Sequence, residues 1–559
     1  MKSTSTITDR QVSASAAHAL AWALVAAVAV VWFGTLDLRH LLRSDEGRYA
    51  EIAREMLASG DWITIRYNGL KYFEKPPLHL WMTAIAYRLF GIGDWQARLW
   101  AATSGAIGIG AVLLASRRWF GPRVGWLAAA VLLATPAWNL ASHFNSLDIG
   151  VSAALAVVLA ATLVAQHPSA DARERRRWML VAWTGAAAAV LTKGLIGIVL
   201  PGLVLIVYSA VTRDLAIWKR LHIGAGALLL IVIAAPWFVL VSLRNPEFPS
   251  FFFIHEHLQR YTTAVHQRTA PFWYFVPQLV AGCAPWCGLA WPMTVAVRSD
   301  KSREALPPLV LLACWCAVIF LFFSASSSKL PGYIVPVYPA LAILAAVTVD
   351  RLSPRAWMRL LVGSVVLAGV VLVAALVVSR VHAAPGVARF GAWIAAGSAL
   401  AVMGMAIAWR LQHQSLRLRS ELAACLALFV GTSVASVGHE AIGGPASGAD
   451  LVPSIERVLA PGMPIYSVSL LDHTLPFYLR RTTIMVAGAD ELEFGVRQEP
   501  DKWIPTLQAF ERAWTSGRPA LAIMSPETYA QLSAEHLPMF RVAADARRVV
   551  VANFPPPAS

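Results

Sequence analysis

The side chains best suited to chemistry lie in a polar stretch near the N-terminus, residues 37–77, after the first apolar run. Within it, residues 45–49 read Asp-Glu-Gly-Arg-Tyr and begin a stretch with apolar residues at the spacing of one helical face, so Asp45 and Glu46 should stand at a helix start, with Arg48 just after them. A carboxylate there can orient a substrate or accept a proton, and a guanidinium can bind a phosphate with two hydrogen bonds. The alternatives are that Asp45 caps the helix and that Arg48 pairs with Asp45 or Glu51.

A second charged pair stands in residues 74–77, Glu-Lys-Pro-Pro, before a short apolar segment at 78–90. The prolines hold Glu74 and Lys75 on a stiff extended segment, because proline disfavours helix in the residue before it. Lys75 is therefore a second candidate for binding a phosphate, with pairing to Glu74 as the alternative. The apolar segment is too short to cross a bilayer, which favours a helix at the membrane surface.

The elements that must position these residues are membrane helices. Hydrophobic residues make up 57% of the 559-residue chain and charged residues 14%, which is too apolar for a water-soluble fold of this length. After a first apolar run at 17–36, twelve further runs are interpreted as spans, giving about 13 transmembrane helices. The twelve runs are 97–115, 124–142, 147–166, 178–192, 195–212, 222–243, 273–297, 307–325, 333–349, 360–379, 390–408 and 421–436.

Positive charge is distributed unevenly among the connections between these runs. Arginine and lysine are concentrated in the loops after the second, fourth, sixth, eighth, tenth and twelfth runs, and such loops stay in the cytoplasm. Because the basic loops follow every second run, the other connections lie outside, which places residues 37–96 and 437–559 on the outer side of the membrane. Topology thus accounts for the net charge of +15, and we expect no nucleic-acid partner. Residues 37–77 nevertheless hold seven basic side chains outside, which favours a use for them on lipid phosphates.

The chain is expected to form two domains, a transmembrane domain of residues 1–436 and an outer α/β domain of residues 437–559. In the second domain, short strand-like runs alternate with helix-like stretches. The strand-like runs are 464–468, 482–486, 520–524 and 547–552, and the helix-like stretches are 503–514 and 526–533. The predicted fold is a polytopic α-helical membrane protein with helices at the membrane surface in its first outer loop and a small C-terminal α/β domain.

Taken in order, the motifs resemble those of a known superfamily. Residues 45–49, residues 74–78 and residues 145–148, Asn-Ser-Leu-Asp, are similar to motifs of the GT-C superfamily of polyprenyl-phosphate-dependent glycosyltransferases. Residues 252–257 and 326–333 are similar to the lipid A 4-amino-4-deoxy-L-arabinose transferase family. That second resemblance covers essentially the whole chain, including the number of spans and the small outer domain.

The resemblance implies a reaction between two lipids. An enzyme of this family transfers aminoarabinose from undecaprenyl phosphate to phosphate groups of lipid A, by an inverting displacement at the periplasmic face of the bacterial inner membrane. The product carries less negative charge, which implies resistance to polymyxin and other cationic antimicrobial peptides. The implied partners are the undecaprenyl-phosphate-linked sugar donor, the lipid A acceptor and membrane lipids.

The resemblance also implies roles for single residues. Asp45 and Asp148 correspond to the acidic catalytic positions of the superfamily. A lipid A phosphate is already ionised and needs no general base, so we expect Asp45 to orient groups or to bind the amine of the sugar. The expected substrate-binding residues, with Arg48 and Lys75 on the leaving phosphate, are Arg48, Tyr49, Lys75, Lys329 and Tyr333.

A divalent metal ion, with zinc favoured, is a further expectation, and its ligands would be Glu74, His255 and His257. The two histidines are only two residues apart, so they can share one ion on an extended segment but not on an α-helix. The alternative is that they are ordinary interfacial histidines in an aromatic belt. Lys193, at the outer end of a span, is expected to reach toward lipid headgroups rather than substrate.

Two other functions are compatible with parts of the pattern. A protein O-mannosyltransferase-like enzyme would use a different sugar and a hydroxyl acceptor, which requires an acidic base and a peptide groove. A lipid or sugar transporter would contain inverted repeats and helices broken near the bilayer midplane. The charged motifs here gather in the outer loops instead, which favours an enzyme working at the membrane surface.

Overall fold

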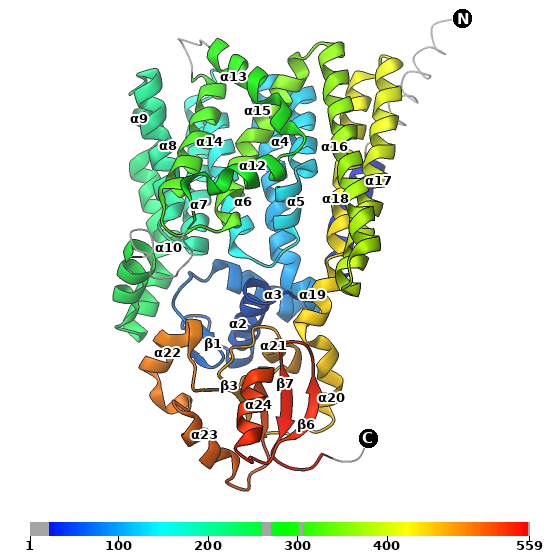
Figure 1. Ribbon diagram of the computed structural model, residues 1–559. Coiled ribbons are helices and arrows are strands. Elements are labelled where there is room, and N and C mark those ends of the chain that lie inside the picture. Colours follow the sequence, from blue (N-terminus) through cyan, green and yellow to red (C-terminus); the bar gives the residue numbers. More distant parts are fainter. Residues whose placement is uncertain (1–18, 20–21, 260–269, 301–305, 557–559) are drawn as a thin grey trace, which may run out of the picture.

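The computed structural model describes residue 19 and residues 22–259, 270–300 and 306–556, without the side chains of residues 257–259. Long helices run side by side, and the C-terminal α/β part lies beyond one end of them (Figure 1). Between the two parts lie α2 (Asp45–Ser59), α3 (Leu78–Phe90) and the hairpin of β1 (Arg66–Tyr67) and β2 (Leu70–Lys71). The predicted helix start at Asp45 and the predicted helix at 78–90 are confirmed.

Within the described ranges, eight helical segments are long and apolar enough to cross a membrane, or nine if the bent pair Phe272–Gly282 and Trp286–Ser299 is one span. The chain is thus a multi-pass membrane protein. The eight segments are α4 (Asp94–Ala134), α6 (Leu147–Ala165), α10 (Ile223–Arg244), α14 (Pro308–Ala325), Pro331–Arg351, α16 (Pro354–Val381), α17 (Pro385–His413) and Arg417–Ser447.

Each of the thirteen predicted runs contains helix, but not every run forms a separate long span. Two runs share α4, where Gly121 at φ 87° and Pro122 interrupt the helix. The first run forms only the short apolar helix Trp22–Gly34. The number thirteen therefore stays a prediction.

The remaining helices connect or complete these spans. Buried α6 lies at the centre against α4 and α7, whereas α10, α16 and α17 leave most of their apolar side chains uncovered, as lipid-facing helices do. These remaining helices are α5 (Pro136–Ser142), α7 (Ala172–Lys193), α8 (Ile196–Thr212), α9 (Ile217–Arg220), η1 (Ser250–Gln259), α12 (Phe275–Gly282), α13 (Ala290–Ser299) and α20 (Val452–Glu456). The span Pro331–Arg351 consists of η4 (Pro331–Val337) and α15 (Tyr338–Arg351), and the span Arg417–Ser447 contains α18 (Arg417–Val437) and α19 (Glu440–Ser447).

The C-terminal part contains a five-stranded mixed sheet in the order β4-β3-β5-β7-β6. Strand β3 is parallel to β4 and β5, and β7 is antiparallel to β5 and β6. The four predicted strands and both predicted helices are confirmed, and β6 is an additional strand. The elements are β3 (Ile465–Val468), α21 (Leu475–Leu479), β4 (Ile484–Val486), α22 (Glu493–Gln498), α23 (Leu507–Trp514), β5 (Leu521–Met524), α24 (Pro526–Ala534), β6 (Phe540–Ala544) and β7 (Val549–Ala552).

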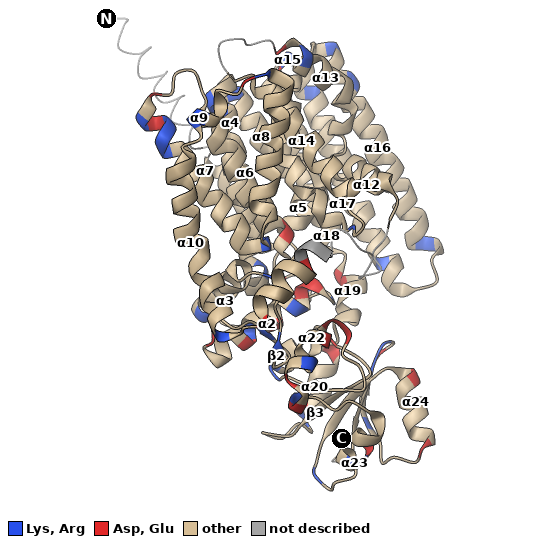
Figure 2. Cartoon of the chain, turned by 90° about the vertical axis from the view of Figure 1, so that its left-hand side faces the viewer, with Lys and Arg blue, Asp and Glu red and all other residues tan. Residues whose placement is uncertain are grey.

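The C-terminal part packs directly on the first outer loop. Glu499 accepts hydrogen bonds from the Arg66 guanidinium at 2.9 Å and from the Lys71 backbone N–H at 2.9 Å, so it holds both strands of the β1–β2 hairpin. Gly47 of α2 lies against the carbonyl of His473, where a Cβ atom would come within 2.3 Å of that oxygen. Only glycine permits this approach. Many of the Lys, Arg, Asp and Glu residues lie in the elements of this junction and at the opposite end of the helices (Figure 2).

Candidate active site

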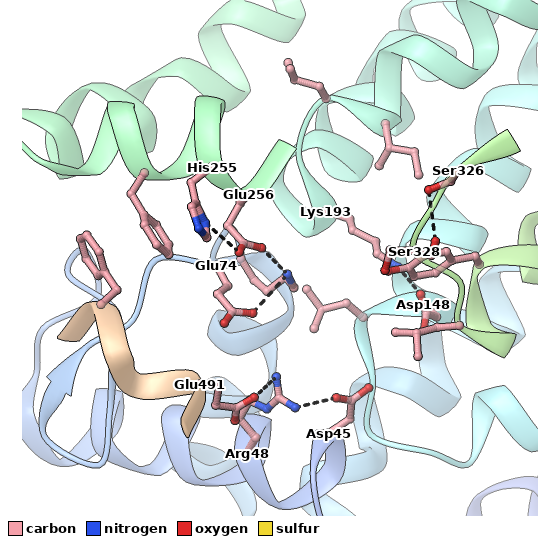
Figure 3. A pocket seen from close by; sticks show the side chains of 18 of the residues that line it. Asp45, Arg48, Glu74, Asp148, Lys193, His255, Glu256, Ser326, Ser328 and Glu491 are labelled. Carbon is pink, nitrogen blue, oxygen red and sulfur yellow. Dashed lines mark hydrogen bonds and ion pairs between the residues drawn. The ribbon is translucent and has the colours of Figure 1, made fainter. Parts of the chain in front are cut away.

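A cavity of about 920 Å³ lies where the first outer loop, the ends of the membrane helices and the C-terminal part meet (Figure 3). Eight residues that the sequence predicts for the site line it, namely Asp45, Arg48, Tyr49, Glu74, Lys75, Asp148, His255 and Tyr333. Lys329 is buried, and its ammonium donates to the carbonyl of Ser326, which lines the cavity. The side chain of His257 lies outside the described residues.

Arg48 is held between two carboxylates. Its Nη2 donates to Asp45 Oδ1 at 3.0 Å, and its Nη1 lies 3.1 Å from Glu491 Oε2 (Figure 3). Nη1 also donates to the hydroxyl of Tyr72 at 3.1 Å. The predicted pairing of Arg48 with Asp45 is thus present, and a phosphate that reaches this guanidinium must compete with both carboxylates.

Lys75 is also paired on two sides. Its Nζ lies 3.4 Å from Glu256 Oε2 and 3.6 Å from Glu74 Oε2. The ammonium therefore occupies the space between the carboxylates that a bound cation would need. No group of three or more His, Cys, Asp or Glu side chains in the described ranges is arranged to hold a metal ion. The metal stays a prediction.

Asp148 forms an ion pair with Lys193 inside the cavity (Figure 3). The Lys193 ammonium also lies 4.6 Å from the centre of the Tyr333 ring, at cation–π distance. The expectation that Lys193 reaches toward headgroups is therefore wrong, because the Asp148 carboxylate gives the ammonium a partner inside the protein. The segment 326–333 approaches the Asp148 carboxylate closely because residue 332 is glycine. A Cβ atom on Gly332 would come within 2.0 Å of Asp148 Oδ2.

The C-terminal part also contributes to the cavity, although none of the sequence motifs lies in it. Asp490, Glu491, Glu493, Phe494 and Arg497 line it, and the Phe494 ring packs 4.0 Å from the ring of Phe251 on η1. Burial raises the pKa of Glu491 to about 7, and neighbouring carboxylates add to the effect while Arg48 opposes it. No local motif marks Glu491, because its partner Arg48 is distant in the sequence.

The lining of the cavity is acidic. Among the described residues, seven carboxylates and four lysine or arginine side chains face it. Every one of the four cations has a carboxylate partner. An anionic substrate alone would meet repulsion here, so the arrangement suits a substrate that carries both a phosphate and a cationic group.

A second cavity of about 820 Å³ lies between the membrane helices and is largely apolar. Residues of α5, α16, α17 and α18 form much of its wall. Asp45, Asp148 and Leu330 line both cavities, so the polar cavity and the apolar cavity meet at the two aspartates. Lipid chains could enter from one side while polar groups stay on the other.

Two segments match known protein families. Residues 74–239 match the dolichyl-phosphate-mannose-protein mannosyltransferase family, and residues 451–553 match the aminoarabinose transferase C-terminal domain.

Curated relatives are similar over more than half of the chain. The undecaprenyl phosphate-alpha-4-amino-4-deoxy-L-arabinose arabinosyl transferase of Aeromonas salmonicida (strain A449) is 34% identical over 386 residues, covering 66% of this chain and 68% of the relative. The enzyme with the same name from Pseudomonas aeruginosa (strain LESB58) is 36% identical over 308 residues, covering 54% of each chain.

Solved structures are similar over nearly the full length. The crystal structure of ArnT from Cupriavidus metallidurans bound to undecaprenyl phosphate has 49% sequence identity and a TM-score of 0.92, covering 96% of this chain and 98% of that one. The archaeal oligosaccharyltransferase AglB from Archaeoglobus fulgidus has 12% identity and a TM-score of 0.52, covering 90% of this chain and 69% of that one, and shares the fold alone.

Proposed function

The chain belongs to the aminoarabinose transferase family of GT-C glycosyltransferases, and we propose that it transfers 4-amino-4-deoxy-L-arabinose from undecaprenyl phosphate to a phosphate group of lipid A. The reaction takes place at the periplasmic face of the bacterial inner membrane. The observation that carries this proposal is the meeting of a charged cavity and an apolar cavity at Asp45 and Asp148. Two lipid substrates can thereby bring their polar groups together while their chains stay among the membrane helices.

Arg48 and Lys75 are the proposed ligands of the donor phosphate. Both lie on rigid elements, Arg48 in the first turn of α2 and Lys75 directly before the two prolines that precede α3. The phosphate becomes the leaving group and gains charge as the sugar departs, so fixed cations stabilise the transition state more than the ground state. Pairing with Glu74, Glu256, Asp45 and Glu491 keeps both cations in place before the donor arrives.

The chemical step is a single displacement at the anomeric carbon. A phosphate oxygen of lipid A forms the new bond to that carbon, while the bond between the carbon and the donor phosphate oxygen breaks. Undecaprenyl phosphate leaves with the bonding electron pair, and the configuration of the carbon inverts. No proton has to be removed from the acceptor, because the attacking oxygen is already ionised.

Asp45 and Asp148 are proposed to hold the sugar rather than to act as bases. Their carboxylates stand where the two cavities meet, and one of them can accept hydrogen bonds from the ammonium group of the sugar. Tyr49 and Tyr333 line the same cavity and are proposed to contact the sugar ring. Lys329, buried behind the wall, is proposed to support this side of the site.

The test is a reconstituted assay with purified protein in vesicles. Undecaprenyl-phosphate aminoarabinose and a polyprenyl-phosphate mannose are offered separately, each with lipid A or with a serine-containing peptide, and products are identified by mass spectrometry. We expect transfer of aminoarabinose to lipid A only. Transfer of mannose to the peptide would instead support an O-mannosyltransferase, and no transfer in any combination would refute the proposal.

A further inference from the structure

Asn145, in the motif at 145–148, contacts Glu46 of the motif at 45–49 and His79, the residue that follows the motif at 74–78. Its backbone N–H donates to Glu46 Oε1 at 2.9 Å, and its side-chain Nδ2 donates to the Glu46 carbonyl at 3.2 Å. Its Oδ1 lies 2.8 Å from Nε2 of His79, in the first turn of α3. All three residues are fully buried. Asn145 therefore joins α2 and α3 at the point where the chain enters α6.

The Glu46 carboxylate is held in place by several hydrogen bonds. Its carboxylate accepts from Arg98 Nε at 2.7 Å and from Arg98 Nη2 at 3.0 Å, and from the backbone N–H of Leu42 at 2.9 Å. Burial alone would raise the pKa of Glu46, but Arg98, Arg39 and the hydrogen bonds together hold it below its usual value. Glu46 is therefore an ionised, fixed acceptor next to the site.

The His79 side depends on Asn145. Burial lowers the pKa of His79 to about 4, so the ring is neutral at pH 7 and carries a single proton. With that proton on Nε2, the ring donates to Asn145 Oδ1. Nδ1 has no hydrogen-bond partner among the described residues. The Asn145 amide is thus the side-chain partner that orients this ring at the start of α3.

Each contact of Asn145 lies close in sequence to a residue of the proposed reaction. Glu46 follows Asp45, His79 lies four residues after Lys75, and Asn145 itself lies three residues before Asp148. We propose that Asn145 is a positioning residue that fixes the spacing of the Asp45, Lys75 and Asp148 side chains for sugar transfer. The inference rests on the proposed function. Asn145 lines neither cavity, so it acts through the residues it holds and not by touching substrate.

The test is Asn145→Ala, measured with the donor and lipid A in vesicles. The substitution deletes both side-chain hydrogen bonds and keeps the backbone bond to Glu46. Since a displacement of about 1 Å costs roughly a hundredfold in rate, we expect kcat to fall about 100-fold. The Kd for undecaprenyl phosphate should change much less than kcat, because Arg48 and Lys75 keep their charges and exact placement matters most in the transition state, when the leaving phosphate gains charge. The matched control is Asn139→Ala, which removes another buried asparagine whose side chain donates to Ser433 Oγ and touches none of these segments.

A second variant separates positioning from loss of folding. His79→Phe keeps an aromatic side chain but deletes the same hydrogen bond, so the double variant with Asn145→Ala should lose little more kcat than the larger single loss. The inference is overturned if Asn145→Ala matches Asn139→Ala in kcat, or if kcat and lipid affinity fall together. A wild-type enzyme that transfers no aminoarabinose would instead refute the proposed function, and this inference with it.

Discussion

The ion pair between Glu491 and Arg48 predicts how donor binding depends on pH. Glu491 Oε2 lies 3.1 Å from Arg48 Nη1, at the place where the donor phosphate is proposed to bind. Burial raises the pKa of Glu491 to about 7, so the carboxylate changes charge near neutral pH. The donor phosphate is a diester with one fixed negative charge, and it binds more easily when Glu491 is protonated and releases the guanidinium.

The size of the effect follows from this pKa. At pH 6 Glu491 is mostly neutral, whereas at pH 8 its protonation costs about 1.4 kcal/mol, which is roughly a factor of ten in affinity. We expect the wild-type Kd for the donor to rise about tenfold from pH 6 to pH 8. Neighbouring His473 does not contribute, because burial lowers its pKa to about 4 and it stays neutral over this range.

The assay is equilibrium binding of the donor to protein in vesicles, without acceptor, between pH 6 and pH 8. In Glu491→Gln the amide keeps the volume but cannot ionise, so the Kd should be nearly constant and close to the low-pH value of the wild type. Glu493→Gln is the matched control, since Glu493 lines the same cavity but pairs with Arg497 and is largely exposed. An equal change of Kd with pH in wild type and Glu491→Gln would refute the reasoning.

Two further predictions concern other parts of the site. Gly332→Ala places a Cβ atom within 2.0 Å of Asp148 Oδ2, so kcat should fall at least about tenfold while the protein stays folded. The transfer rate measures the loss of activity and the melting temperature checks the fold; an unchanged rate would contradict the packing argument. Burial and nearby Glu51 raise the pKa of Glu55 to about 8, so between pH 4.5 and 8 the folded protein holds a proton that the unfolded chain has lost. The free energy of unfolding should therefore fall by about 2 kcal/mol from pH 6 to pH 8. Unfolding of wild type and Glu55→Gln at both pH values tests this, and an equal loss in both proteins would contradict it.

Local sequence signals predicted the elements that carry the first-loop motifs. The helix start at Asp45 and the short helix at 78–90 follow from apolar spacing and from two prolines, and both are present. Strands β3, β4, β5 and β7 of the C-terminal sheet were predicted because their side chains are largely apolar, and in the structure most of these side chains are buried. Strand β6 was missed because none of its side chains is fully buried, unlike most of those in the other edge strand β4, and its first two residues, Phe540 and Arg541, are exposed.

Long-range pairing could not be predicted from one sequence. Glu491 and Arg48 meet only because the C-terminal part folds back onto α2, and nothing near either residue indicates the other. The ion pair of Lys193 is a second example, because a lysine at the end of a span is expected to contact lipid headgroups. Only the folded structure brings Asp148 beside it. In the motif at 145–148 the sequence indicates a role for Asp148 only. Its contacts to Glu46 and His79 exist only in the folded protein.

The most direct test of the central claim is the rate of aminoarabinose transfer to lipid A by Lys75→Ala, measured by mass spectrometry beside the wild type. The control is Lys219→Ala, because Lys219 is an exposed lysine of α9 at the opposite end of the molecule (Figure 1). Loss of a fixed cation at the leaving phosphate should lower kcat by about 10² to 10³, while the control keeps the wild-type rate. Wild-type rates in both variants, or no transfer by the wild type, would contradict the account.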